Sequence, residues 1–352
     1  MKTLNSVLDN KNNFDAIRLL AAIGVIFSHA YPALVGSNKT EFFYVLSGGQ
    51  TTLGDLCVAI FFIISGLLIT QSFLRSASLI DYFTNRVLRI VPALFVVSLV
   101  ICVIIGPIVT QAESRDYWTN YLTARYMGNA LIYPSAQQLP GVFTHHAYPL
   151  LTNASIWTLS YEFTCYVYIA AICLAFRKAW FASIALFLFA TATVFYTYIS
   201  PEIFLRFSSY FFAGSIAYWS RKWLVLDFRI FLLSIVALCA ATYFHHALVP
   251  TICVFGTYAT IYIAYAERFK AQNASRYGDF SYGVYLWAWP VQQLLSPYTA
   301  TATENFLAST PIVFVAAYLS WRLVEKPALS KKKIVASFLR DKLSRSRILS
   351  LD

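Results

Sequence analysis

The sequence predicts an all-α integral membrane protein, a bundle of about ten transmembrane helices with both termini in the cytoplasm. Three observations support this prediction. Of the 352 residues, 59% are hydrophobic and only 12% are charged, whereas soluble domains carry about 25% charged residues. Ten apolar runs are long enough to cross a bilayer. The basic residues, finally, gather at alternate ends of these runs, as cytoplasmic loops require.

The ten apolar runs cover most of the chain, and no linker divides them into separate domains. A polar stretch at 111–154 is the long loop within the bundle. We therefore expect a membrane-embedded domain at 1–330 and a basic cytoplasmic tail at 331–352. The runs lie at 14–34, 53–73, 88–110, 155–176, 180–199, 203–220, 229–245, 248–266, 281–299 and 308–325.

The basic residues set the orientation of the chain. With a cytoplasmic N-terminus, 23 of the 27 lysines and arginines lie in or beside inside segments. Membrane topology therefore explains the net charge of +11, and no nucleic-acid partner is expected. The tail from Lys331 predicts a solvated or membrane-surface helix attracted to anionic lipid, with a specific partner-binding role as the alternative. The outside segments keep Lys39, Arg115, Arg125 and Arg206.

Neither a disulfide framework nor a metal site is expected. The six cysteines fall in or beside apolar runs, which favours buried free thiols. Four histidines form the pairs His145–His146 and His245–His246, without acidic or cysteine companions at ligand spacing. The sequence also has no glycine-rich phosphate loop and no G-x-S-x-G motif.

The first apolar run carries two ionisable side chains, Arg18 and His29, eleven residues apart. In an α-helix that separation is roughly 16 Å of rise and leaves only about 20° between the two side chains. Ionisable groups inside a membrane span are unfavourable and usually functional, so this shared face predicts part of an active site. Taken alone, His29 could hydrogen-bond between helices, and Arg18 could reach the cytoplasmic interface.

Two further arginines precede the third span. Arg86 and Arg89 form an R-x-x-R motif, whose spacing puts both guanidiniums on one side of a helix. With Arg18 they bring three guanidiniums to the cytoplasmic mouth. Such a group suits a polyphosphate, because its forked donors match phosphate oxygens. Ordinary positive-inside topology is the alternative.

Glu162 lies about seven residues into the fourth span, roughly 10 Å below the outer surface. His29 is expected at a similar depth. A carboxylate within reach of an imidazole fixes its tautomer and raises its basicity. We therefore expect Glu162 to orient His29, an interhelical hydrogen bond without chemistry being the alternative.

Six stretches resemble the integral-membrane acyltransferase-3 family, which includes bacterial O-acetyltransferases of surface polysaccharides. They occur in the family's order between residues 14 and 327. Two positions depart from the pattern. Cys57-Val58-Ala59 replaces a frequent G-V-D, with Asp55 displaced upstream, and Ala288 replaces a frequent histidine. The stretches are FDAIRLLAAIGVIFSHA, FFIISGLLIT, NRVLRIVPAL, SIWTLSYEF, FSYGVYLWAWPV and WRLVEKP.

The resemblance implies ten helices in a bacterial inner membrane and transfer of an acyl group, usually acetyl, from acyl-CoA to a carbohydrate hydroxyl. It makes His29 the catalytic histidine, with Arg18 as its motif partner. Arg86 and Arg89 would hold the nucleotide end of acetyl-CoA, and Glu162 would be the acidic residue of the fourth-span motif. Because His29 lies toward the outer side, the expected acceptor is a lipopolysaccharide O-antigen, an exopolysaccharide or a lipid-linked glycan.

Two mechanisms and two other classes of function remain open from the sequence. His29 could act as a general base or form an acyl-histidine intermediate. A multispanning transporter or flippase of a glycan or small solute is the main alternative class, since ionisable residues also mark transport paths. Transporters often show inverted repeats and broken helices, and neither is evident. A non-catalytic scaffold would leave the ionisable residues without a purpose.

Overall fold

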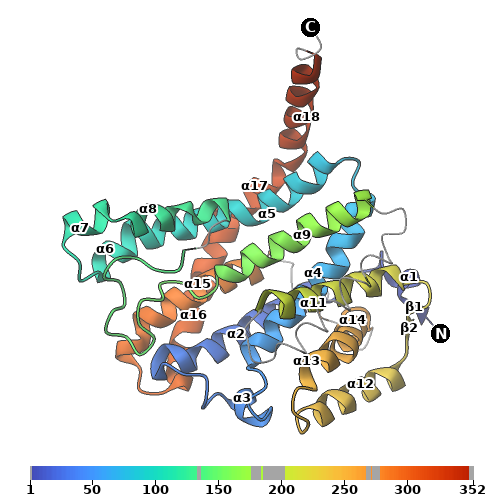
Figure 1. Ribbon diagram of the computed structural model, residues 1–352, viewed down its shortest axis with the longest axis horizontal. Helices are drawn as coiled ribbons and strands as arrows, with labels where there is room; N and C mark the ends of the chain where they lie inside the picture. The colour runs from blue at the N-terminus through green and yellow to red at the C-terminus, as the bar shows by residue number, and fades with distance from the viewer. Residues whose placement is uncertain are drawn as a thin grey trace.

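The computed structural model describes residues 2–132, 136–175, 184, 203–266, 271 and 278–348. Within these ranges the chain is mostly helical, and long helices pack side by side in one bundle (Figure 1). A two-stranded antiparallel pairing joins β1 (Lys2–Thr3) to β2 (Val225–Leu226). The long α-helices are α2 (Phe14–Val35), α4 (Leu53–Arg75), α5 (Leu79–Val100), α9 (Trp157–Ala175), α11 (Ile203–Trp219), α12 (Phe228–Ala241), α15 (Ser281–Leu295), α16 (Ala302–Ser320) and α18 (Lys332–Ile348).

In the part of the chain that the structure describes, three helices each continue through one π-helical turn, a feature that often marks functional sites. Helix α5 passes through η1 (Ile101–Ile105) into α6 (Gly106–Val109). Helix α13 (Leu248–Thr251) passes through η3 (Ile252–Gly256) into α14 (Thr257–Tyr265). Helix α16 passes through η6 (Trp321–Glu325) into α17 (Lys326–Ser330).

Short helices connect these long elements. Helices α1 (Leu4–Val7) and α3 (Phe42–Leu46) flank α2, and η5 (Ser296–Tyr298) follows α15. The polar stretch at 111–154, expected to be a long loop, contains α7 (Ser114–Thr119), α8 (Tyr121–Met127) and η2 (Gly128–Leu131). Figure 1 shows α7 and α8 beside the far end of the α5–α6 helix.

Six helices in the described ranges are long and apolar enough to cross a membrane, so the prediction of a helical multi-pass membrane protein is confirmed. The predicted run at 180–199 lies almost entirely outside the described residues. The runs at 203–220, 229–245 and 281–299 form helices of 17, 14 and 15 residues. The six are Phe14–Val35, Leu53–Arg75, Leu79–Val109, Trp157–Ala175, Leu248–Tyr265 and Ala302–Ser330.

Three helices begin at the same local signal, a Ser or Thr three residues before an acidic residue. The side chains of Thr52, Ser78 and Thr301 accept hydrogen bonds from the backbone N–H groups of Asp55, Asp81 and Glu304. Each bond satisfies an N–H that would otherwise lack a partner in the first turn. These bonds define the starts of α4, α5 and α16, and they place α5 and α16 earlier than the runs predicted at 88–110 and 308–325.

The core is built around α4, which packs against α2 on one side and α11 on another. Gly66 of α4 and Gly214 of α11 allow these two helices to cross closely, because a methyl group on either glycine would overlap a carbonyl oxygen of the opposite helix. Thr70 Oγ1 donates to Ser215 Oγ at 2.8 Å in the same interface. Small residues at a helix crossing permit close backbone approach inside a membrane.

Replacing Gly214 with alanine should therefore destabilise the bundle by roughly 1–3 kcal/mol, since the added methyl overpacks a rigid interface. The measurement is thermal unfolding of the purified protein in detergent. Gly128→Ala is the matched control, because a Cβ at Gly128 meets no atom within 4 Å. Equal melting temperatures for the two variants would contradict the proposed tight crossing.

A proline in α15 fixes the loop that precedes α9. Pro290 has no N–H, so the carbonyl of Leu286 lacks its usual helical donor. The side-chain amide of Asn153, fully buried, donates to that carbonyl at 3.1 Å. Trp289 Nε1 also donates to the backbone oxygen of Leu151 at 2.8 Å. The loop at 151–153 is therefore tied to the middle of α15.

All six cysteines are free thiols, as the sequence predicted. Four of them are buried, but Cys239 of α12 is exposed. The expectation of burial was wrong at that position because Cys239 lies on the outer face of a peripheral helix, among exposed apolar residues.

Candidate functional site

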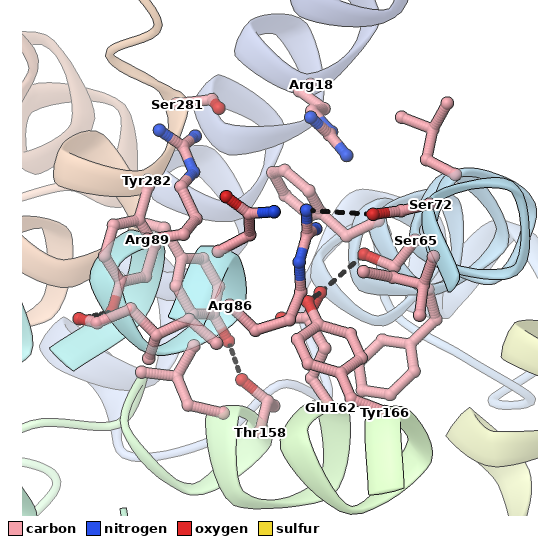
Figure 2. Close-up of a pocket in the computed structure, with 18 of the residues that line it drawn as sticks. Arg18, Ser65, Ser72, Arg86, Arg89, Thr158, Glu162, Tyr166, Ser281 and Tyr282 are labelled. Carbon is pink, nitrogen blue, oxygen red and sulfur yellow. Dashed lines mark hydrogen bonds between the residues drawn. The ribbon is translucent and has the colours of Figure 1, made fainter. Parts of the chain in front are cut away.

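A cavity of about 480 Å³ lies among the helices that carry most of the predicted site residues. Residues of α2, α4, α5, α9 and α15 line it, together with Leu329 of α17 and Lys332 of α18. Four lining side chains among the described residues are cationic, and one is acidic. Figure 2 shows arginines on one side and Glu162, Tyr166 and Thr158 of α9 on the other.

Arg18 and Arg86 reach this cavity from α2 and α5, and Figure 2 shows their guanidiniums approaching each other. Arg86 Nη2 donates to Ser72 Oγ of α4 at 3.5 Å, a long and weak contact. Its Nε is buried and has no hydrogen-bond partner among the described residues. A buried donor without a partner costs about 1–3 kcal/mol, so Arg86 is available for an anion.

Arg89 lies one turn further along α5, as its i, i+3 spacing predicted, and lines the same cavity. Its guanidinium is ion-paired with Asp279 and lies 3.7 Å from Glu325. About a quarter of the Arg89 side chain stays exposed, whereas Glu325 is 1% exposed. Arg89 therefore faces the cavity from a fixed position between two carboxylates.

Asp279, just before α15, is ionised in this setting. Burial alone would raise its pKa, but the guanidiniums of Arg89 and Arg18 and two hydrogen bonds from Ser281 lower the pKa below its usual value. Ser281 donates through its hydroxyl at 2.6 Å and through its backbone N–H at 3.3 Å. The beginning of α15 is thus locked to α5.

Glu162 lies in the arginine cavity and not in hydrogen-bond contact with His29, so the expected pairing of these two described residues was wrong. Glu162 Oε1 accepts from Ser65 Oγ at 2.5 Å and from Tyr166 OH at 2.6 Å. Ser65 lies near the middle of α4, whereas the first turn of α4 meets Ser28, the neighbour of His29, at Gly54. Glu162 and His29 therefore lie at different heights in the bundle, and the depth counted along the fourth span did not place them together.

His29 lies on α2 three turns beyond Arg18, outside the lining of the cavity. Its ring packs edge-on against Trp289 of α15, with ring centroids 5.4 Å apart. Its Nδ1 is buried and has no hydrogen-bond partner among the described residues. An unsatisfied buried imidazole nitrogen is rare in a folded protein and calls for an explanation.

Asp55 is the carboxylate whose charge acts on His29. The first turn of α4 carries it, and Gly54 beside it lets α4 approach Ser28, the neighbour of His29. Asp55 Oδ2 lies 3.2 Å from a guanidinium nitrogen of Arg206 on α11. The residue displaced from the G-V-D position is thus brought near the histidine by helix packing.

One helix connects the cavity with the surroundings of His29. Tyr285 of α15 lines the cavity, and its hydroxyl is 2.6 Å from Thr158 Oγ1. Trp289, which contacts His29, lies four residues later on α15. Residues four apart share a helix face, so the cavity and the histidine are about one helical turn apart along α15.

Sequence reasoning missed the partners that hold these residues. Asp279 and Glu325 position Arg89, and Ser65 and Tyr166 position Glu162. Glu325 and Ser65 occur in two of the six family-like stretches, WRLVEKP and FFIISGLLIT, so a signal existed for them. Asp279 lies just outside such a stretch, at its N-terminal edge.

Comparison with known proteins extends these observations. The profile of a family described as acyltransferase domain matches residues 11–324. An O-acetyl transferase of Shigella phage Sf6 is 29% identical over 336 residues, covering 92% of this chain and 98% of that protein. Nodulation protein 10 of Rhizobium leguminosarum bv. viciae is 28% identical over 384 residues, covering 95% of this chain and 97% of that protein. No solved structure matches the chain.

Proposed function

The chain belongs to the acyltransferase-3 family, and on that premise we propose that it is a membrane O-acyltransferase. It moves an acyl group, acetyl in the simplest case, from acyl-CoA to a hydroxyl of a cell-surface or lipid-linked carbohydrate. The observation that carries the proposal is the cavity in which Arg18, Arg86 and Arg89 meet beside Glu162. The phage relative's name, O-acetyl transferase, agrees with this reaction.

The cavity fits the nucleotide end of an acyl-CoA. Its volume falls within the range of about 300–1,000 Å³ that is usual for small-molecule sites. Arginine guanidiniums pair with phosphate oxygens through forked donors. The unpartnered Nε of Arg86 is an unused donor of this kind. We therefore assign Arg18, Arg86 and Arg89 to binding of the donor phosphates.

The thioester end of the donor would then extend past Tyr285 toward His29. Tyr285 lines the cavity, and Trp289 beside His29 follows one turn later. The pantetheine arm of coenzyme A is long and thin, which suits a path between helices. Glu162, held by Ser65 and Tyr166, lies along the wall of this path.

In the proposed reaction His29 is the general base. Its imidazole removes the proton from the acceptor hydroxyl while the hydroxyl oxygen attacks the thioester carbonyl. The C–S bond breaks, and the proton passes from the imidazolium to the departing thiolate of coenzyme A. Asp55 of α4 provides negative charge that stabilises the imidazolium.

The proposal also includes the topology predicted from the sequence. Ten helices cross a bacterial inner membrane, both termini are cytoplasmic, and residues 331–352 form a basic tail after the catalytic domain. In this orientation the arginine cavity opens toward the cytoplasm, where acyl-CoA is made. His29 lies nearer the outer side, where a periplasmic or lipid-linked glycan would be acylated. No metal is required by this scheme.

Acetyl transfer in isolated membranes tests this function directly. Membranes containing the protein and the native glycan are incubated with acetyl-CoA labelled in the acetyl group, and base-labile label on extracted glycan is measured. We expect label well above that of membranes without the protein. Absence of label with acetyl and with longer acyl donors would overturn the proposed reaction. Label that accumulates on the protein instead would favour an acyl-histidine intermediate.

A further inference from the structure

The cationic cavity extends beyond the segment that the family profile covers. Leu329 of α17 and Lys332, the first residue of α18, line it together with the arginines. The profile ends at residue 324, and the sequence alone placed Lys332 in a separate basic tail. The structure therefore puts a side chain of that tail at the wall of the cavity.

Ion pairs on both sides of Lys332 hold this segment against α5, the helix that carries the R-x-x-R arginines. Before it, Glu325 of η6 is paired with Arg89. After it, Arg340 lies 2.9 Å from Asp81 near the start of α5. Helices α17 and α18 pack along α5 between these pairs. Figure 1 shows α18 leaving the bundle at this point. Packing thus defines the position of Lys332.

Lys332 adds positive charge that no carboxylate compensates. Within the described part of the chain, Lys332, Arg18 and Arg86 make no salt bridge, whereas Arg89 is paired with two carboxylates. Three such cations share a cavity with one acidic side chain, Glu162. Like charges that line one cavity repel each other, so an anionic ligand with several charges would relieve this repulsion.

We propose that Lys332 binds a phosphate group of the acyl-CoA nucleotide, so that the start of α18 is part of the donor site. The inference rests on the proposed function and names a further residue of the same site. Coenzyme A carries a pyrophosphate and a 3′-phosphate, so its phosphate groups can bind a third cation besides the two unpaired arginines. A lysine ammonium binds phosphate as a point charge beside the forked arginine donors.

Binding of coenzyme A to the purified protein tests this inference, measured by calorimetry in a detergent with an uncharged head group. We expect Lys332→Ala to raise the Kd about tenfold, the usual effect of losing a charged hydrogen bond. Lys332→Arg should stay within about threefold, since it keeps a cationic donor. Lys333→Ala is the matched control, because it removes the same charge from the next residue, which does not line the cavity.

The outcomes separate this inference from the proposed function. If the wild type binds coenzyme A and Lys332→Ala binds equally well, the role of Lys332 is wrong while the donor site stands. Equal weakening in Lys332→Ala and Lys333→Ala would overturn it as well, because a general charge effect of the tail would then explain the data. If the wild type neither binds coenzyme A nor transfers acetyl, the proposed function itself fails.

Discussion

Replacing His29 with alanine is expected to lower acyl transfer by about 10²- to 10⁴-fold, the usual contribution of a general base, in a protein that still folds. The fold should survive because the His29 ring makes one edge-on contact with Trp289, and its buried Nδ1 has no hydrogen-bond partner to lose among the described residues. The measurement is label transferred to glycan per amount of protein, with coenzyme A binding as a check on the donor site.

Two comparisons make this result specific. His145→Ala is the matched control, since His145 lies exposed in the loop before α9 and should keep full activity. Asp55→Asn and Glu162→Gln then compare the two carboxylates. If Asp55 stabilises the imidazolium, its variant should lower kcat with little change in the KM for the donor. Full activity of His29→Ala at equal protein level would contradict the assignment of His29 as general base.

The helices that carry the site could be predicted because their signals are local. An apolar run of suitable length predicts a span, although α5 begins at Leu79, nine residues before the predicted run at 88–110. The i, i+3 spacing of Arg86 and Arg89 and the eleven-residue spacing of Arg18 and His29 depend only on helix geometry. These predictions needed no knowledge of which helices touch.

Contacts between helices could not be predicted in the same way. Height along a helix follows from residue number, but rotation about the helix axis depends on packing. Glu162 was expected beside His29, but α9 places it against Ser65 in the middle of α4. Asp55 shows the converse. It looked displaced in the motif, yet the close approach of α2 and α4 at Gly54 brings it near His29.

Arg89→Ala is expected to behave differently from Arg86→Ala, although the sequence gives the two arginines the same role. Removing Arg89 leaves Glu325, whose side chain is 1% exposed, and Asp279 without their counter-charge. Breaking such a buried pair by removing one partner costs about 3–5 kcal/mol, a large part of the 5–15 kcal/mol that stabilises a typical protein. Arg89→Ala should therefore lower the melting temperature and the yield of folded protein in detergent.

Arg86→Ala should leave stability nearly unchanged, because Arg86 makes no salt bridge among the described residues and only one long hydrogen bond. Its effect should appear in the KM for acetyl-CoA. A third variant separates stability from binding at Arg89. Arg89→Met combined with Glu325→Leu and Asp279→Asn removes both ion pairs together, and replacing buried charges by neutral side chains in this way is often neutral or stabilising. The triple variant should regain stability without regaining donor affinity. If Arg89→Ala proves as stable as Arg86→Ala, the two carboxylates do not position Arg89, and its charge acts on the donor alone.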